Sequence, residues 1–226
     1  MSSTRARPTE TTETIDTPAG EARVTWHPAP AGRARLVLAL GHGAGGGIEA
    51  RDLQALAAAL PVLGITVALA EQPWRVAGKK VAAAPKVLDA GWTALWPAFA
   101  GPGLPVVAGG RSAGARVACR TAAELGAAGV LALAFPLHPP GRPEKSRAEE
   151  LLGAGRPVLV VQGGRDAFGR PEEFPERGAR GASYELVEVE GGDHGFAVPK
   201  RTGPTQEEAL EVITGAVTGW LGRLRV

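Results

Sequence analysis

Three residue types that cooperate in nucleophilic catalysis occur along this chain in the order Ser112, Asp166 and His194. A serine hydroxyl is a poor nucleophile at neutral pH, and it becomes reactive when an imidazole accepts its proton and a carboxylate orients that imidazole. We interpret Ser112 as a nucleophile, His194 as its base and Asp166 as the acid. Asp193 is an alternative acid, but because it adjoins His194 we expect it to form a turn instead.

The sequence around Ser112 is typical of a nucleophile elbow, a tight turn between a strand and a helix. The serine is flanked by Gly110 and Gly114, it follows an apolar run over 104–108, and residues 113–125 predict a helix. Glycines at these two places would let the strand and the helix approach closely. The chain contains 32 glycines, so the spacing alone is only moderately specific, and a glycine-rich turn with a solvated serine is the alternative.

A nucleophile of this kind needs two hydrogen-bond donors for the oxyanion that forms during the reaction. The backbone N–H of Ala113 is the first candidate, and the second is expected from the loop 41–47, where Ala44 is the best placed residue. A flexible connector is the alternative for this loop. It lacks the Gly-Lys-Ser/Thr ending of a phosphate-binding loop and does not match the dinucleotide-binding pattern.

Several other side chains follow predicted strands and are candidates for a substrate pocket. For Arg111, attraction of an anionic part of a substrate and an ion pair with a nearby carboxylate are equally good interpretations. For His42, hydrogen bonding that shapes the glycine loop is favoured over a role as a base. The candidates for the pocket are His42, Trp74, Arg111, His138, Phe168 and Phe196.

The composition is that of a globular domain and argues against several kinds of partner. The chain has 226 residues, is 44% hydrophobic and carries a formal net charge of +2. No basic stripe with interleaved aromatic residues occurs, so we expect no nucleic-acid partner. We find neither an apolar run of membrane-spanning length nor a secretory signal, so we expect no membrane partner and a cytoplasmic location. The 4 histidines are scattered, so we expect no metal and no other cofactor.

The chain is expected to form one domain over 15–226, preceded by a polar segment, 1–14, that we expect to be disordered or frayed. The single cysteine, Cys119, falls within the helix predicted after Ser112. We interpret it as a small core residue, with a reactive thiol as the alternative. The oligomeric state is left open.

Apolar segments of strand length alternate along the chain with amphipathic segments of helical period. This alternation predicts an α/β fold in which a mostly parallel sheet is covered by helices on both faces. In such sheets functional groups collect at the carboxyl ends of the strands. The expected strands are 22–27, 34–40, 65–70, 104–108, 130–135, 157–162 and 184–189, and the expected helices are 51–60, 85–99, 113–125, 147–152, 171–177 and a last one after a capping box at 205–208.

Five motifs together resemble those of a small α/β-hydrolase, most closely the predicted bacterial hydrolases related to dienelactone hydrolase. The chain is also similar to the hydrolase-like domain of a subunit of the non-specific-lethal chromatin complex. Dienelactone hydrolase uses a cysteine nucleophile, whereas Ser112 stands here, so lactone specificity is not implied. The motifs are Gly41-His42-Gly43-Ala44-Gly45, Gly109-Gly110-Arg111-Ser112-Ala113-Gly114, Phe135-Pro136-Leu137-His138-Pro139-Pro140, Gly163 with Asp166, and Gly192-Asp193-His194-Gly195-Phe196.

The resemblance implies an α/β-hydrolase fold in which cap domains are inserted after the strand that ends near Phe135. Only about 20 residues separate that strand from the next, so we expect a minimal cap or none. The implied activity is that of a serine hydrolase that cleaves a carboxylic ester or thioester of a small-molecule acyl substrate through an acyl-enzyme. An amidase or peptidase with the same three residues, and an inert interaction module that keeps the fold, are the alternatives.

Overall fold

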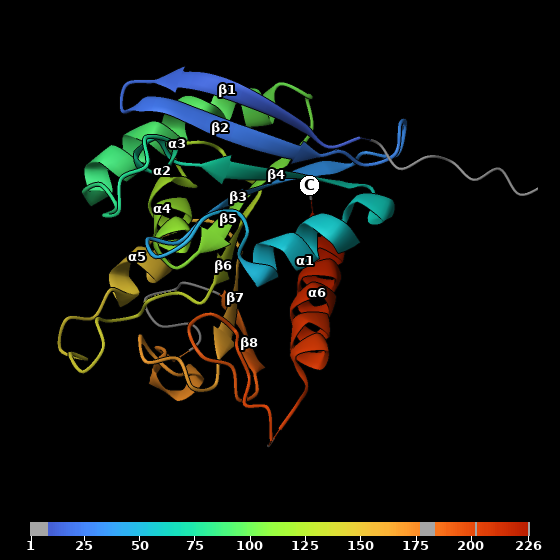
Figure 1. Ribbon diagram of the computed structural model, residues 1–226. Coiled ribbons are helices and arrows are strands. Elements are labelled where there is room, and N and C mark those ends of the chain that lie inside the picture. Colours follow the sequence, from blue (N-terminus) through green and yellow to red (C-terminus); the bar gives the residue numbers. More distant parts are fainter. Residues whose placement is uncertain (1–8, 177–183, 202, 226) are drawn as a thin grey trace, which may run out of the picture.

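The computed structural model describes residues 9–176, 184–201 and 203–225. These residues form an eight-stranded sheet in the order β1-β2-β4-β3-β5-β6-β7-β8 (Figure 1). From β4 to β8 neighbouring strands are parallel, whereas β1–β2 and β2–β4 are antiparallel, which confirms the mostly parallel sheet. The strands are β1 (Thr11–Thr17), β2 (Gly20–His27), β3 (Leu36–Gly41), β4 (Ile65–Glu71), β5 (Val106–Arg111), β6 (Gly129–Leu133), β7 (Val158–Gly163) and β8 (Tyr184–Val189).

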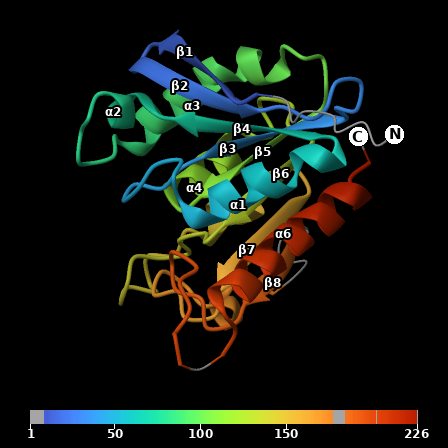
Figure 2. The ribbon, with the colours of Figure 1, turned by 45° about the vertical axis from the view of Figure 1, so that its right-hand side comes forward.

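Helices cover both faces of this sheet, as predicted. Helices α1 (Arg51–Ala59) and α6 (Gln206–Arg223) lie together on one face, and α3 (Pro85–Ala100), α4 (Ala113–Thr121) and α5 (Ala148–Leu152) lie on the other (Figure 2). The segment after β4, expected to be a loop, contains a single helical turn, α2 (Pro73–Val76). Two short 3-10 turns complete the described elements, Pro61–Leu63 and Pro171–Glu173. The second stands where a helix over 171–177 was expected, and residue 177 lies outside the described residues.

The side chains of the central strands alternate between two cores. In β3, Leu36, Leu38 and Leu40 pack toward α1 and α6, whereas Val37 and Ala39 pack toward α3 and α4. The smaller residues face the side on which α3 supplies bulky aromatic rings, including those of Trp92 and Phe99, whose centroids are 5.2 Å apart. Because both faces are covered, these strands are apolar throughout, which explains why they read as continuous apolar runs.

Strand β1 corrects the expectation that residues 1–14 are disordered or frayed. Thr11 to Thr14 belong to this strand and pair with β2. The Thr12 and Thr25 hydroxyls lie 3.2 Å apart, and Trp26 donates a hydrogen bond to Glu13. An edge strand with an exposed face needs no apolar pattern, and threonine has a high strand propensity, so polar composition was a misleading signal there. Residues 1–8 lie outside the described part of the chain.

The chain between β6 and β7 contains no lid. Residues 134–157 include one helix, the five-residue α5. The expectation of a minimal cap or none is therefore confirmed. No described helix has the length and apolar character needed to cross a membrane.

Candidate active site

The elbow at Ser112 depends on glycines that no larger residue could replace. Ser112 has φ +52° and ψ −114°, a strained conformation for a residue with a side chain. A Cβ added to either Gly110 or Gly114 would lie 2.5 Å from the carbonyl oxygen of Gly41. The backbones of β3, β5 and α4 therefore meet at a distance that only glycine allows, and the serine turns sharply out of the sheet at the N-terminus of α4.

Strand β5 extends further than the apolar run predicted. It continues through Gly109 and Gly110 to Arg111, although two successive glycines usually indicate the end of a strand. A Cβ at Gly109 would lie 2.9 Å from the carbonyl oxygen of Leu131 in β6. Here glycine serves the close approach of two strands and does not end one.

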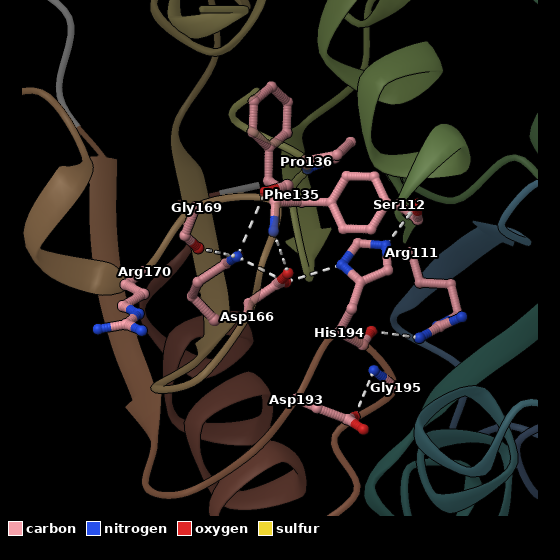
Figure 3. A network of polar contacts seen from close by, with 12 residues as sticks. Arg111, Ser112, Phe135, Pro136, Asp166, Gly169, Arg170, Asp193, His194 and Gly195 are labelled. Atoms are coloured by element: carbon pink, nitrogen blue, oxygen red, sulfur yellow. Dashed lines mark hydrogen bonds and ion pairs between the residues drawn. The ribbon is translucent and has the colours of Figure 1, made fainter. Parts of the chain in front are cut away.

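The three residues proposed for catalysis lie together at the carboxyl edge of the sheet (Figure 3). The Nε2 atom of His194 is 2.8 Å from Ser112 Oγ, and its Nδ1 atom is 2.7 Å from Asp166 Oδ2. With Nδ1–H donating to the carboxylate, Nε2 is left to accept the hydrogen bond of the serine hydroxyl. Hydroxyl, imidazole and carboxylate thus form one continuous chain of hydrogen bonds.

The carboxylate of Asp166 is fully buried and held by three donors. Besides His194, Gln162 Nε2 donates to Oδ2 at 2.9 Å and the backbone N–H of Phe168 donates to Oδ1 at 2.8 Å. Burial of a carboxylate is costly unless it is hydrogen-bonded, and these three donors compensate for that cost. Asp193 is engaged elsewhere, because its Oδ1 accepts the backbone N–H groups of two residues in its own turn.

Gln162 is a residue that the sequence analysis missed. It is the last residue but one of strand β7, is fully buried, and its Nε2 also lies 2.8 Å from the Gly169 carbonyl oxygen. A lone amide at the end of a strand otherwise made of valine and leucine was the available signal. This amide joins the end of β7 to the loop that carries Asp166.

Arg111 forms an ion pair, which decides between its two interpretations. Its Nε donates to Asp52 Oδ2 at 3.1 Å, and its Nη2 donates to the backbone carbonyl of His194 at 2.6 Å. Asp52 lies on α1 and is fully buried. Burial raises the pKa of Asp52, and the charge of Arg111 opposes that shift. The residue next to Ser112 therefore anchors the loop of His194 to α1.

His42 shapes the glycine loop through both ring nitrogens. Its Nδ1–H donates to the Gly43 carbonyl at 2.9 Å, and its Nε2 accepts the backbone N–H of Gln72 at 3.1 Å. Burial lowers the pKa of His42, although the Gly43 carbonyl acts in the opposite direction. A neutral ring with both nitrogens occupied cannot serve as a base, so His42 orders the loop that passes Ser112.

The proposed oxyanion donors have free N–H groups. Within the described chain, no acceptor is hydrogen-bonded to the backbone N–H of Ala113 or of Ala44. Ala113 is the first residue of α4, where the N–H groups of a helix are unsatisfied. The glycine loop passes beside the nucleophile, since a Cβ at Gly43 would lie 3.3 Å from Ser112 Cβ.

The remaining pocket candidates divide into residues near the site and residues away from it. The ring of Phe168 stacks on His194, with centroids 4.2 Å apart, and Trp74 packs against His42 at 5.4 Å. Phe196 as a pocket wall is wrong, because its ring is fully buried in the core with α1 and α6. The ring of His138 is hydrogen-bonded to Glu173 and to the Pro139 carbonyl, while its backbone N–H donates to the Phe168 carbonyl.

Two other expectations concern metals and the cysteine. Among the described residues, no group of three or more His, Cys, Asp or Glu side chains could hold a metal ion. Cys119 is buried in α4, and burial raises the pKa of its thiol to about 12. A thiol with this pKa is protonated at neutral pH, so the structure favours the core role over the reactive one.

The sheet order and the elbow are those of the α/β-hydrolase class of proteins. A family described as the alpha/beta hydrolase domain matches residues 32–222, and the chain belongs to this family. No curated protein matches the chain. The expected relation to α/β-hydrolases is therefore confirmed, whereas the similarity to a chromatin-complex subunit stays a prediction.

Solved structures of hydrolases share this fold. The chain is 22% identical to a serine hydrolase without a lid from Xanthomonas campestris, with a TM-score of 0.67 over 94% of this chain and 96% of that chain. It is 18% identical to a dienelactone hydrolase from Anabaena variabilis, with a TM-score of 0.71 over 97% and 100%. It is also 18% identical to a thermophilic esterase from Thermogutta terrifontis, with a TM-score of 0.65 over 96% and 100%. At these identities the likeness concerns the fold.

Proposed function

We propose that this protein is a serine hydrolase that cleaves a carboxylic ester or thioester of a small-molecule substrate through an acyl-enzyme. One observation carries the proposal: His194 lies 2.8 Å from Ser112 Oγ and 2.7 Å from Asp166 Oδ2. These distances suit proton transfer from the hydroxyl to the imidazole without any rearrangement of the chain. The esterase and dienelactone hydrolase of the same fold support the choice of substrate class.

In the acylation step, Ser112 Oγ attacks the carbonyl carbon while its proton passes to His194 Nε2. The imidazolium is stabilised by the ionised Asp166. The negative oxygen of the tetrahedral intermediate is met by the N–H groups of Ala113 and Ala44, which have no acceptor among the residues that the structure describes. His194 then returns the proton to the leaving alcohol or thiol as the bond to carbon breaks, and the acyl group stays on the serine.

In the deacylation step, the same groups act on water. His194 accepts a proton from a water molecule, whose oxygen attacks the acyl carbon, and the proton then passes to Ser112 Oγ as the acid product leaves. No lid has to open for water or substrate, since α5 is the one helix between β6 and β7.

Active-site labelling tests this proposal directly. A fluorophosphonate probe is expected to label the wild-type chain at Ser112 and to spare the Ser112→Ala variant. Ser146→Ala is the matched control, because Ser146 is exposed and far from His194 in the sequence, and this variant should be labelled like the wild type. A wild-type chain that no fluorophosphonate labels would contradict the proposal.

Turnover distinguishes the alternatives that share the fold. A panel of p-nitrophenyl esters is expected to be hydrolysed by the wild type and not by His194→Ala. An ester and an anilide with the same acyl group separate an esterase from an amidase, and we expect faster cleavage of the ester. Labelling of Ser112 without turnover of any member of either set would instead indicate an inert module.

A further inference from the structure

Two cavities lie between the sheet and the helices on the α3 side. The larger, of about 400 Å³, lies between the β1–β2 hairpin, α2 and the start of α3, and is bordered by Glu21, Arg23, Lys79 and Val87 among others. Figure 1 shows α2 and α3 beside these strands. The smaller has a volume of about 10 Å³, space for one water molecule or one methyl group.

The smaller cavity reaches the elbow. It is bordered by Ala113 and Gly114, the two residues after the nucleophile, and by Gly41 and His42, which begin the glycine loop. These two segments carry the two N–H groups proposed to bind the oxyanion. A substrate whose carbonyl oxygen lies between them therefore has one of its substituents next to this cavity.

The walls of the smaller cavity are mostly apolar, apart from the polar atoms of His42, Gln72 and Trp92, of which Gln72 Oε1 and Trp92 Nε1 have no hydrogen-bond partner among the described residues. Trp92, Val117 and Ala82 line it beside the segments already named. Trp92 and Val117 are buried and belong to the hydrophobic core on the α3 side. A methyl group that enters this space leaves water without displacing a charged side chain.

The opening on the other side of the elbow has a different character. A depression of about 380 Å³ is bordered by Arg111 and Gly195, the neighbours of the nucleophile and of the base, and by the charged side chains of Glu49, Arg51 and Asp52. Since His194 must protonate the leaving group, the leaving group has to lie on the His194 side. The polar depression thus suits the alcohol, and the apolar cavity is left for the acyl group.

Three side chains separate the apolar cavity from the larger cleft. Gln72, Trp74 and Leu88 border both spaces. The largest of the three is the indole of Trp74, which is buried and packs against the His42 ring at a centroid distance of 5.4 Å. The Trp74 indole and the Leu88 side chain thus separate the smaller cavity, of about 10 Å³, from the larger cleft, of about 400 Å³.

We propose that the small cavity is the acyl subsite and that Trp74, with Leu88, limits it to short acyl groups, so that the substrates are short-chain esters of polar alcohols. This inference rests on the proposed hydrolase function. Shortening either partition residue joins the subsite to the larger cleft and admits longer chains. Each methylene that is thereby removed from water raises kcat/KM by about fourfold.

The test compares kcat/KM for p-nitrophenyl acetate and p-nitrophenyl octanoate. The wild type is expected to prefer the acetate. Trp74→Ala and Leu88→Ala are expected to raise the octanoate-to-acetate ratio by at least about tenfold. Because Trp74→Ala also removes the support of His42, the ratio is the readout, since a general loss of rate cancels in it. Leu88→Ala provides the same readout if Trp74→Ala does not fold.

Trp96→Ala is the matched control. Trp96 is a half-buried tryptophan on α3 that packs on Phe99 and borders neither space, so the ratio should not change. A wild type that cleaves the octanoate as well as the acetate would overturn the inference. So would an unchanged ratio in both partition variants while fluorophosphonate still labels Ser112. If the wild type is not labelled at all, the hydrolase function fails as well, which separates the two results.

Discussion

The two sides of Ser112 are built by different interactions. On the side of His194, the ring donates a hydrogen bond to Asp166 and the backbone carbonyl accepts one from Arg111, and these directional contacts fix the ring and its backbone (Figure 3). On the side of Ala113, packing of Trp74 and Leu88 shapes an apolar space. The difference matches the roles proposed for the two sides: proton transfer tolerates little variation in distance and angle, whereas selection of an acyl group would depend on volume.

The polar side also contains two buried carboxylates, and each is compensated differently. Asp166 accepts three hydrogen bonds, one of them from the ring that it orients. Asp52 is paired with the guanidinium of Arg111. A buried carboxylate without such partners would be strongly destabilising. The network therefore serves the fold as well as the chemistry, and variants must be chosen to separate the two roles.

The largest effect is expected when the acid of the polar side is neutralised without a change of shape. Asp166→Asn should lower kcat by roughly 10⁴-fold, because an amide cannot stabilise the imidazolium and favours the wrong tautomer of His194. Initial rates with p-nitrophenyl acetate measure this loss. Asp193→Asn is the control and should keep kcat within a few-fold, since its Oδ1 only accepts backbone N–H groups. The reverse ranking of the two variants would make Asp193 the acid.

A smaller effect is expected from the ion pair behind the base. Arg111→Met removes the donor to the His194 carbonyl, and we expect kcat to fall by roughly 10- to 100-fold with little change in KM. It also leaves Asp52 buried and unpaired, which should lower the free energy of unfolding by about 3–5 kcal/mol, measured by urea denaturation. Arg116→Met is the control, because Arg116 pairs with Glu150 away from the three residues.

A double variant separates positioning from folding at this ion pair. Asp52→Leu with Arg111→Met removes both charges, and the free energy of unfolding should recover most of the loss. The value of kcat should stay low, because the carbonyl of His194 still lacks its donor. Full recovery of kcat in the double variant would mean that Arg111 acts only through stability.

On the polar side, the sequence was sufficient to predict those residues whose positions follow from chain order and from the ends of the strands. Asp166 and His194 each follow a strand of a parallel sheet, and such strands end at one edge, so their meeting with Ser112 could be predicted. Asp52 could not be predicted, because it lies 59 residues from Arg111 on a helix, and nothing local in α1 indicates its partner. Gln162 was missed although it lies only 4 residues from Asp166 and its polarity within an apolar strand was visible.

The apolar side was predicted less well. Trp74 was a candidate from its place after β4, but its position between two cavities depends on the packing of α2 against α3, which no periodicity of a four-residue helix can indicate. The assignment of Phe196 to the pocket was wrong because φ at this residue is +55°, so its ring enters the core instead of the site. A turn conformation of this kind is rare for a residue with a large side chain and gives no sequence signal.

His42 connects the two sides and makes stability depend on pH. Because burial lowers its pKa in the folded state, the unfolded chain binds an extra proton as the pH falls through 6.5. The folded state should therefore lose up to ~1.4 kcal/mol per pH unit below that value. Urea denaturation between pH 7.5 and pH 5 measures this slope for the wild type and for His42→Asn, whose side chain does not titrate.

The pKa of His138 is shifted in the direction opposite to that of His42, which provides an internal check on the pH dependence of stability. The Pro139 carbonyl and then the Glu173 carboxylate raise the pKa of His138, so its contribution is present below pH 6.5 and is lost as the pH rises through the folded pKa. The contribution of His138 cancels in the difference between the unfolding free energies of the wild type and His42→Asn, since both chains keep His138. If that difference does not grow as the pH falls, His42 does not carry the acid sensitivity.

The smallest effect is expected at Cys119, which lies on the same helix as the elbow but inside the core. Burial raises the pKa of its thiol to about 12, whereas Ser112 is hydrogen-bonded to the His194 ring at the start of that helix. Cys119→Ala should leave kcat unchanged and lower the free energy of unfolding by about 1 kcal/mol. Iodoacetamide should modify Cys119 in urea and not in the folded chain, as mass spectrometry would measure. Rapid modification of the folded chain, with loss of activity, would show that the Cys119 thiol is accessible and reactive, which would contradict its role as a core residue.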